Sequence, residues 1–276
     1  MRKLREYLNR PLSFAVFLLI IISTVITALT VVFIIGYIFI KGVPNLSLDL
    51  FSLKYSSANQ SMLPSIINTV YLTALTLLLA VPIGIFSAIY LAEYSRKNSF
   101  FVKIINIANE TLSGIPSIVY GLFGFLAFVI SKKWGYSLLA GVITLAIMVL
   151  PLIIRTSQEA MLGVDNTFRE ASYGLGAGKL RTVFKIVLPS AMPGILSGII
   201  LAIGRIVGET AALIYTAGTV PEAATKLTSS SRTISVHLYC LLNEGLYTEQ
   251  AYATAVVLIV FVVIINALSN ALQRKL

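Results

Sequence analysis

The feature that most limits the fold of this chain is an uncharged apolar run from residue 12 to residue 40. A helix needs about 20 predominantly apolar residues to cross the hydrocarbon core of a membrane. The run is too long for the apolar region of a signal peptide, about 7–15 residues, so we expect it to remain as an anchor. Similar stretches follow at about 66–91, 104–130, 136–154, 191–217 and 251–272. The sequence therefore predicts an all-α integral membrane protein with six transmembrane helices.

The start of the third stretch is ambiguous. Glu110 introduces a charge, and the segment Gly114-Ile115-Pro116 favours a helix break because proline lacks a backbone donor. We therefore expect a surface segment that leads into a span beginning near Ile115.

The composition excludes several other classes of protein. Only 12% of the residues are charged and 57% are hydrophobic, whereas a soluble domain has about 25% charged residues. The net charge of +10 does not indicate nucleic-acid binding, because no soluble stretch is long enough to carry a basic face. Cys240 and His237 are the single cysteine and the single histidine. They exclude a disulfide framework and a cysteine- or histidine-rich metal site.

Lysine and arginine residues predict the orientation in the membrane. With the N-terminus in the cytoplasm, 14 of the 21 basic residues flank the spans on the inside and 6 lie outside. Cytoplasmic flanks carry an excess of lysine and arginine, so we expect both termini in the cytoplasm. The pair Lys132 and Lys133 is a local exception.

This orientation places the connection at 156–188 in the cytoplasm. Thr167 and Glu170 have the spacing of a capping box, which predicts a short helix that begins at Thr167. Gly174 or Gly176 is expected to end it, because glycine accepts the left-handed conformation of a helix C-terminus. A second helical stretch should then lead to Pro189. The helix is either an ordinary capped loop helix or a docking element for a soluble partner.

The same connection resembles the "EAA" loop of ABC importer permeases, with serine in place of the second alanine. The matching positions are Glu170, Ala171, Ser172, Gly176, Ile186, Leu188 and Pro189. The resemblance implies the type I ABC importer permease fold over residues 62–272, with a coupling loop at about 156–189 that docks on a separate ATPase. Residues 1–61 would then form a cytoplasmic tail, the first transmembrane helix and an outer loop.

The chain lacks a nucleotide-binding motif of its own. The segment from Gly174 to Lys179 superficially resembles a phosphate-binding loop, but Gly174 and Gly178 are separated by three residues instead of four, and Leu180 replaces the required hydroxyl. We therefore expect no cofactor in this chain, with ATP and magnesium bound by the partner ATPase. No arrangement of nucleophile, base and acid indicates an enzyme.

Arg205 and Glu209 lie within the fifth apolar stretch, where an arginine costs about 2.5–3.5 kcal/mol on insertion scales. Because they are four residues apart, we expect them to share one helix face. They form either a neutralising structural pair or a polar constriction on a substrate path. Arginine presents a planar fork of donors to an oxyanion, and the Glu209 carboxylate can accept a hydrogen bond from monohydrogen phosphate but none from fully ionised sulfate.

Two segments carry a second resemblance. Gly204–Ala211 (GRIVGETA) and Ser113–Gly124 (SGIPSIVYGLFG) are similar to stretches of the A-type permease subunit of phosphate-specific ABC importers. The resemblance implies a substrate path that includes Arg205, Glu209 and Thr210. It also implies a sister permease, an ATPase dimer, an external phosphate-binding protein and a location in a bacterial cytoplasmic (inner) membrane. The alternatives are an importer of another oxyanion, such as molybdate or sulfate, and an ATP-independent channel or carrier.

Overall fold

The computed structural model describes residues 11–95 and 99–273. Within these ranges the chain is helical and has no strand. Five helices are long and apolar enough to cross a membrane, and a sixth span results if a pair bent by 101° is counted as one. The predicted all-α fold with six spans is therefore confirmed. The cytoplasmic tail expected at residues 1–10, and the basic flanks Arg96, Lys97, Arg274 and Lys275, lie outside the described residues.

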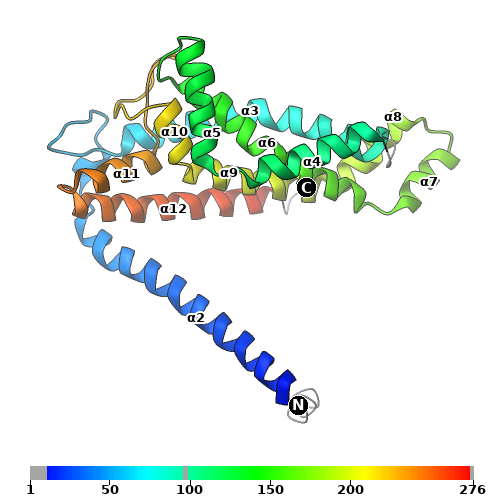
Figure 1. Ribbon diagram of the computed structural model, residues 1–276, viewed down its shortest axis with the longest axis horizontal. Coiled ribbons are helices and arrows are strands. Elements are labelled where there is room, and N and C mark those ends of the chain that lie inside the picture. Colours follow the sequence, from blue (N-terminus) through cyan, green and yellow to red (C-terminus); the bar gives the residue numbers. More distant parts are fainter. Residues whose placement is uncertain (1–10, 96–98, 274–276) are drawn as a thin grey trace.

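The five long helices are α2 (Pro11–Gly42), α3 (Leu63–Ile89), α6 (Leu138–Leu162), α9 (Leu188–Gly208) and α12 (Thr248–Gln273). Figure 1 shows α3, α6, α9 and α12 side by side along the length of the molecule. Helix α6 is central, because it packs against both α3 and α9. Its buried residues Leu145, Val149 and Ile153 are completely shielded from solvent and form the middle of the main apolar core.

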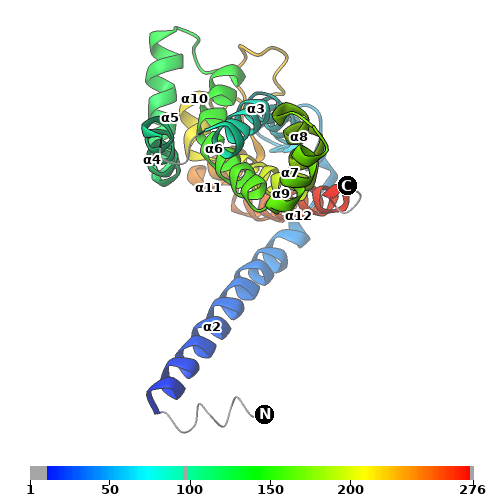
Figure 2. The same cartoon turned by 90° about the vertical axis from the view of Figure 1, so that its right-hand side faces the viewer.

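Helix α2 projects away from this bundle (Figures 1 and 2). It contacts α12 near its C-terminal end, and none of its most apolar 18-residue window is buried within the chain. Figures 1 and 2 both show its N-terminal half projecting away from the other helices. An apolar surface of this length is stable only against lipid or against another apolar helix.

The bent pair consists of α4 (Phe100–Gly114) and α5 (Ser117–Gly124), which continues into the π-helical segment η4 (Phe125–Ser131). The two helices meet at Ile115 and Pro116, where the backbone is extended. The break predicted from Gly114-Ile115-Pro116 is confirmed. Pro116 accounts for the break, because the proline ring disfavours helical backbone in the preceding residue, Ile115.

The fifth apolar stretch differs from expectation, because it is not one continuous helix. Helix α9 ends at Gly208, Glu209 has extended backbone (φ −73°, ψ 131°), and α10 (Ala211–Thr216) begins two residues later. The prediction that Arg205 and Glu209 share a helix face is therefore wrong. The four-residue spacing brings two side chains together only where the helix is uninterrupted.

The fourth span is longer than expected, since α6 continues to Leu162. The connection that follows contains α7 (Asn166–Gly174), α8 (Lys179–Thr182) and the π-helical segment η5 (Val183–Val187), which runs directly into α9. Helix α7 ends at Gly174 as predicted, and Gly176 has φ +81°. Helical structure also leads up to Pro189 as predicted, and this proline lies in the first turn of α9.

The predicted capping box is wrong. The N-cap residue of α7 is Asp165, whose Oδ1 accepts hydrogen bonds from the Thr167 amide at 2.9 Å and from the Thr167 hydroxyl at 2.8 Å. These bonds lower the pKa of the Asp165 carboxyl. Aspartate is as good a cap as threonine or better, so the N-cap lies two residues earlier than the Thr167–Glu170 spacing indicated.

The opposite end of the bundle carries η1 (Val43–Asn45), η2 (Leu48–Phe51) and α11 (Ile234–Glu244). Figure 1 places α11 at one end of the molecule and α7 and α8 at the other. The two ends therefore have different connections available for contact with other proteins.

Candidate functional site

Glu209 occupies the break between α9 and α10. Its side chain is buried, and its Oε1 accepts a hydrogen bond from the Ala212 amide at 3.0 Å. A carboxylate at the first turn of a helix satisfies a free amide and interacts favourably with the helix dipole. Glu209 therefore holds the start of α10 in place. Thr210, which follows it, is partly exposed, and its hydroxyl points to the Gly208 carbonyl at 3.5 Å.

A side chain bridges the other break, between α4 and α5. The Tyr120 hydroxyl on α5 donates to the Leu112 carbonyl on α4 at 2.7 Å, and Tyr120 is buried. The Leu112 carbonyl also accepts from the Ile115 amide at 3.2 Å, so the tyrosine bond is a second bond, and it ties α5 to the last turn of α4. It also fixes the direction in which α5 leaves the bend.

The two breaks lie next to each other. Helices α5 and α10 pack in direct contact, and a Cβ on Gly121 would lie 2.8 Å from the Cα of Ala212. The Arg205 guanidinium, near the end of α9, interacts electrostatically with Tyr120. The segments at 113–124 and 204–211, which are far apart in the sequence, therefore form one structural unit.

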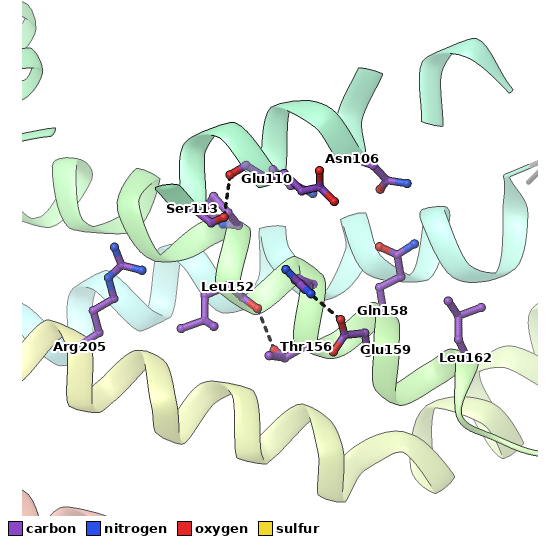
Figure 3. Close-up of a pocket in the computed structure, with 12 residues that line it drawn as sticks. Asn106, Glu110, Ser113, Leu152, Thr156, Gln158, Glu159, Leu162 and Arg205 are labelled. Atoms are coloured by element: carbon purple, nitrogen blue, oxygen red, sulfur yellow. Dashed lines mark hydrogen bonds and ion pairs between the residues drawn. The ribbon is translucent and has the colours of Figure 1, made fainter. Parts of the chain in front are cut away.

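A cavity of ≈ 470 Å³ opens beside this unit, between α4, α6 and α9. Its volume lies within the range of about 300–1,000 Å³ found for small-molecule sites. The residues around it are mostly polar, and Figure 3 shows Glu110 of α4 and Arg205 of α9 approaching it from different helices. The polar lining residues are Asn106, Asn109, Glu110, Ser113, Arg155, Thr156, Gln158, Glu159 and Arg205.

Two arginines in the cavity differ in their partners. Arg155 Nε donates to Glu159 Oε1 at 2.9 Å, which forms an exposed ion pair. Arg205 forms no hydrogen bond or ion pair with any residue in the described part of the chain. Its fork of donors is therefore free to bind an oxyanion in the cavity.

The predicted path residues are thus only partly brought together. Arg205 lines the cavity, whereas Glu209 and Thr210 lie at the adjoining break and are not among its lining residues. The polar side chains that α4 and α6 contribute to the cavity were not predicted from the sequence. On α4 these residues are spaced at 106, 109, 110 and 113, which is the spacing of one helix face.

The segment with the "EAA" pattern has one exposed and one buried side. Glu170 and Ala171 are exposed on α7, and Ile186 is partly exposed in η5. Ser172 is buried, and its hydroxyl is 2.8 Å from that of Thr182. A hydroxyl at 172 therefore joins α7 to α8, which explains why serine is accommodated at this position.

His237 and Arg232 are buried at the end that carries α11. The His237 ring contacts Tyr55 edge-on, with centroids 6.4 Å apart, and the Arg232 guanidinium lies 4.7 Å from the centre of the same ring. Burial, reinforced by the charge of Arg232, lowers the pKa of His237 to about 3. The described residues contain no group of three or more His, Cys, Asp or Glu side chains arranged to hold a metal ion.

Comparisons with known proteins agree with this architecture. Residues 80–276 match the family described as "binding-protein-dependent transport system inner membrane component". The chain is 35% identical over 230 residues to the phosphate transport system permease protein PstA of Pasteurella multocida, covering 82% of this chain and 81% of that protein. It is 32% identical over 249 residues to the probable ABC transporter permease protein YqgI of Bacillus subtilis, covering 84% of each.

Two solved structures share the fold. One is a bacterial ABC transporter involved in the import of the acidic polysaccharide alginate, with a TM-score of 0.68, 18% identity and coverage of 100% of this chain and 99% of that one. The other is the MetNI methionine ABC transporter in an inward-facing conformation, with a TM-score of 0.58, 16% identity and coverage of 77% and 92%.

Proposed function

This chain is a PstA-type permease, a member of the family of binding-protein-dependent transport system inner membrane components, and we propose that it forms half of the translocation path of an ATP-driven inorganic phosphate importer. The observation that carries the proposal is the free Arg205 guanidinium in a polar cavity beside two helix breaks. Its proposed partners are a PstC-like sister permease, a PstB-like ATPase dimer and a PstS-like phosphate-binding protein.

Phosphate suits the charges of this cavity. Arg205 supplies donors to an oxyanion from α9, and Glu110, which lines the same cavity from α4, supplies an acceptor. Monohydrogen phosphate can donate a hydrogen bond to a carboxylate, whereas sulfate is fully ionised and would leave the carboxylate unpaired and repelled. A buried polar group left unpaired is a strong source of discrimination, and this applies to Glu110, which is exposed in this chain, once the sister permease covers the cavity. In this arrangement Glu209 supports the path by holding α10.

Transport would be coupled to the ATPase through α7. We place its exposed face, with Glu170 and Ala171, against the cytoplasmic ATPase, which binds ATP and magnesium, so this chain hydrolyses nothing itself. This places α7 and both termini in the cytoplasm, and α11 outside. The first 61 residues would contribute α2 and an outer loop, and residues 62–272 the importer core.

Radiolabelled phosphate uptake into vesicles that contain this chain and its three partners tests the proposal. We expect uptake that requires ATP and is unaffected by excess sulfate or molybdate. Competition by either anion would still agree with an importer but would show that the substrate is another oxyanion. Uptake without ATP would contradict the coupling role of α7 and favour a channel or carrier.

A further inference from the structure

The coupling helix α7 is tied to the end of α3 by a buried ion pair. Arg169 on α7 donates to Glu93 Oε1 from Nη2 at 2.6 Å and from Nε at 3.1 Å. The two side chains are only 13% and 6% exposed, whereas those of Arg155 and Glu159 are 65% and 62% exposed. Exposed ion pairs contribute little, but removing one partner of a buried pair leaves an uncompensated charge.

The same guanidinium also holds the end of α6. Arg169 Nη1 donates to the Val164 carbonyl at 2.7 Å, and Nη2 donates to the Met161 carbonyl at 2.8 Å. A planar fork with several donors can bind several acceptors at once in a fixed geometry. Arg169 therefore joins α7, the C-terminal end of α6 and the C-terminal end of α3.

A second contact also joins the loop that carries α7 and α8 to the end of α3. Glu93 belongs to the π-helical segment η3 (Tyr90–Tyr94), which continues α3. At the end of the same segment, the Lys179 ammonium of α8 lies 4.9 Å from the centre of the Tyr94 ring. The side of the loop that faces away is open, since Phe168 is 56% exposed and Leu175 is 90% exposed. One side is thus attached to α3, and the other is available to a partner.

Helix α3 is in turn closely packed against the helix that lines the cavity. A Cβ on Gly84 of α3 would lie 2.6 Å from Cγ2 of Ile153 on α6. Ala88, one turn further along α3, is completely buried. Close-packed helices of this kind transmit a displacement and do not absorb it. A movement of α7 would therefore move α3 and α6 together.

We propose that Glu93 is a positioning residue for transport, because through Arg169 it converts displacement of α7 into movement of α3 and α6 around the Arg205 cavity. The inference rests on the proposed function as an ATP-driven permease. Glu93 itself does not line the cavity. Its loss should therefore change the coupling between ATP hydrolysis and transport and leave the cavity residues in place.

The test is the number of phosphate ions transported per ATP hydrolysed by the reconstituted four-component complex. We expect Glu93→Ala to lower this ratio about tenfold or more, since a buried arginine is left without its partner. Glu93→Gln should lower it less, because its amide oxygen still accepts from Arg169. Glu244→Gln, which removes an exposed carboxylate from the end of α11, serves as a charge-matched control with an unchanged ratio. An unchanged ratio in Glu93→Ala would overturn the proposal.

Amide hydrogen exchange in the nucleotide-free complex separates this inference from the proposed function. We expect Glu93→Ala to accelerate exchange in α7 about tenfold or more, with α12 unchanged, because the pair protects the loop from local opening. Unchanged exchange in α7 would overturn the link even if transport were impaired. If the unmodified complex shows no ATP-dependent uptake, the proposed function is wrong, while exchange still decides whether Glu93 holds α7.

Discussion

Gly121 on α5 faces the backbone of Ala212 on α10 so closely that any larger residue at position 121 would force the two helices to shift. A Cβ there would lie 2.8 Å from the Ala212 Cα and 3.1 Å from the Ala211 carbonyl oxygen. Contact between two backbones cannot be relieved by rotating a side chain. This backbone contact holds the two helix breaks together. It thereby fixes the end of α9, on which Arg205 lies.

Substitution of Gly121 should therefore separate α5 from α10. We expect Gly121→Ala to destabilise the chain by about 1–3 kcal/mol, the usual cost of overpacking, and to reduce phosphate uptake. Thermal unfolding of the purified complex and uptake in vesicles measure the two effects. Gly36→Ala is the matched control, because a Cβ at that position of α2 meets nothing within 4 Å. Equal behaviour of the two variants would contradict the prediction.

The apolar stretches predicted most of this architecture, because every helix that crosses a membrane needs an apolar run as long as the hydrocarbon core is thick. The bend at Pro116 was predicted as well, since proline acts on the backbone wherever it lies. The break at Glu209 was not predicted, because Gly208-Glu209-Thr210 contains no proline. That break depends on a carboxylate capping Ala212 and on the contact between α5 and α10, both of which are tertiary features.

The cavity was only partly predictable for a related reason. Arg205 is conspicuous as a charge inside an apolar stretch, whereas Asn106 and Asn109 lie in a segment that resembled a surface helix. Their spacing identifies a polar face of α4, but nothing in the sequence shows that this face turns toward α6 and α9. The cap at Asp165 was overlooked because the Thr167–Glu170 spacing offered an equally regular pattern.

Removing the Arg205 guanidinium should prevent the path from accepting phosphate. We expect Arg205→Ala to lower uptake by about 10- to 100-fold, the equivalent of about 1.5–3 kcal/mol for hydrogen bonds to a charged group. Arg205→Lys should be intermediate, because it keeps the charge and loses the fork. Uptake is compared with that of Lys54→Ala, which removes an exposed lysine elsewhere. Normal uptake by an assembled Arg205→Ala complex would show that Arg205 does not bind phosphate and has a structural role only.

The buried His237 should make the α11 end sensitive to acid. Its folded pKa of about 3 lies below the ordinary value of 6.5, so the unfolded chain binds the proton more readily. The contribution of neutral His237 is complete above pH 6.5 and is lost as the pH falls toward 3, by up to about 1.4 kcal/mol per pH unit.

We expect His237→Phe to reduce this loss, because phenylalanine keeps a ring against Tyr55 and does not titrate. The measurement is the unfolding temperature of the complex between pH 6.5 and 5, a window above the ordinary pKa values of carboxylates. The positive charge of Arg232 next to His237 strengthens the effect in the native chain. An identical slope in both proteins would show that His237 is protonated without cost.

Glu110 should decide between phosphate and sulfate within the permease itself. Its carboxylate can accept a hydrogen bond from monohydrogen phosphate, whereas the amide of Glu110→Gln can also donate one to sulfate. Glu110 is exposed in this chain, so the cost of about 1–3 kcal/mol for an unpaired buried group, about 5- to 150-fold in affinity, applies once the sister permease covers the cavity. We therefore expect Glu110→Gln to lower the preference for phosphate over sulfate by about this factor.

The external binding protein would mask this change in an uptake experiment, since it would select the anion before the permease does. Binding of radiolabelled phosphate to the purified permease pair, with sulfate as competitor and without the binding protein, isolates the contribution of the cavity. Glu244→Gln again controls for the loss of one carboxylate, because it lies at the α11 end. If sulfate displaces phosphate equally well from the Glu110→Gln variant and from the unmodified chain, Glu110 takes no part in selecting the anion. The carboxylate that distinguishes the two anions would then belong to the sister subunit.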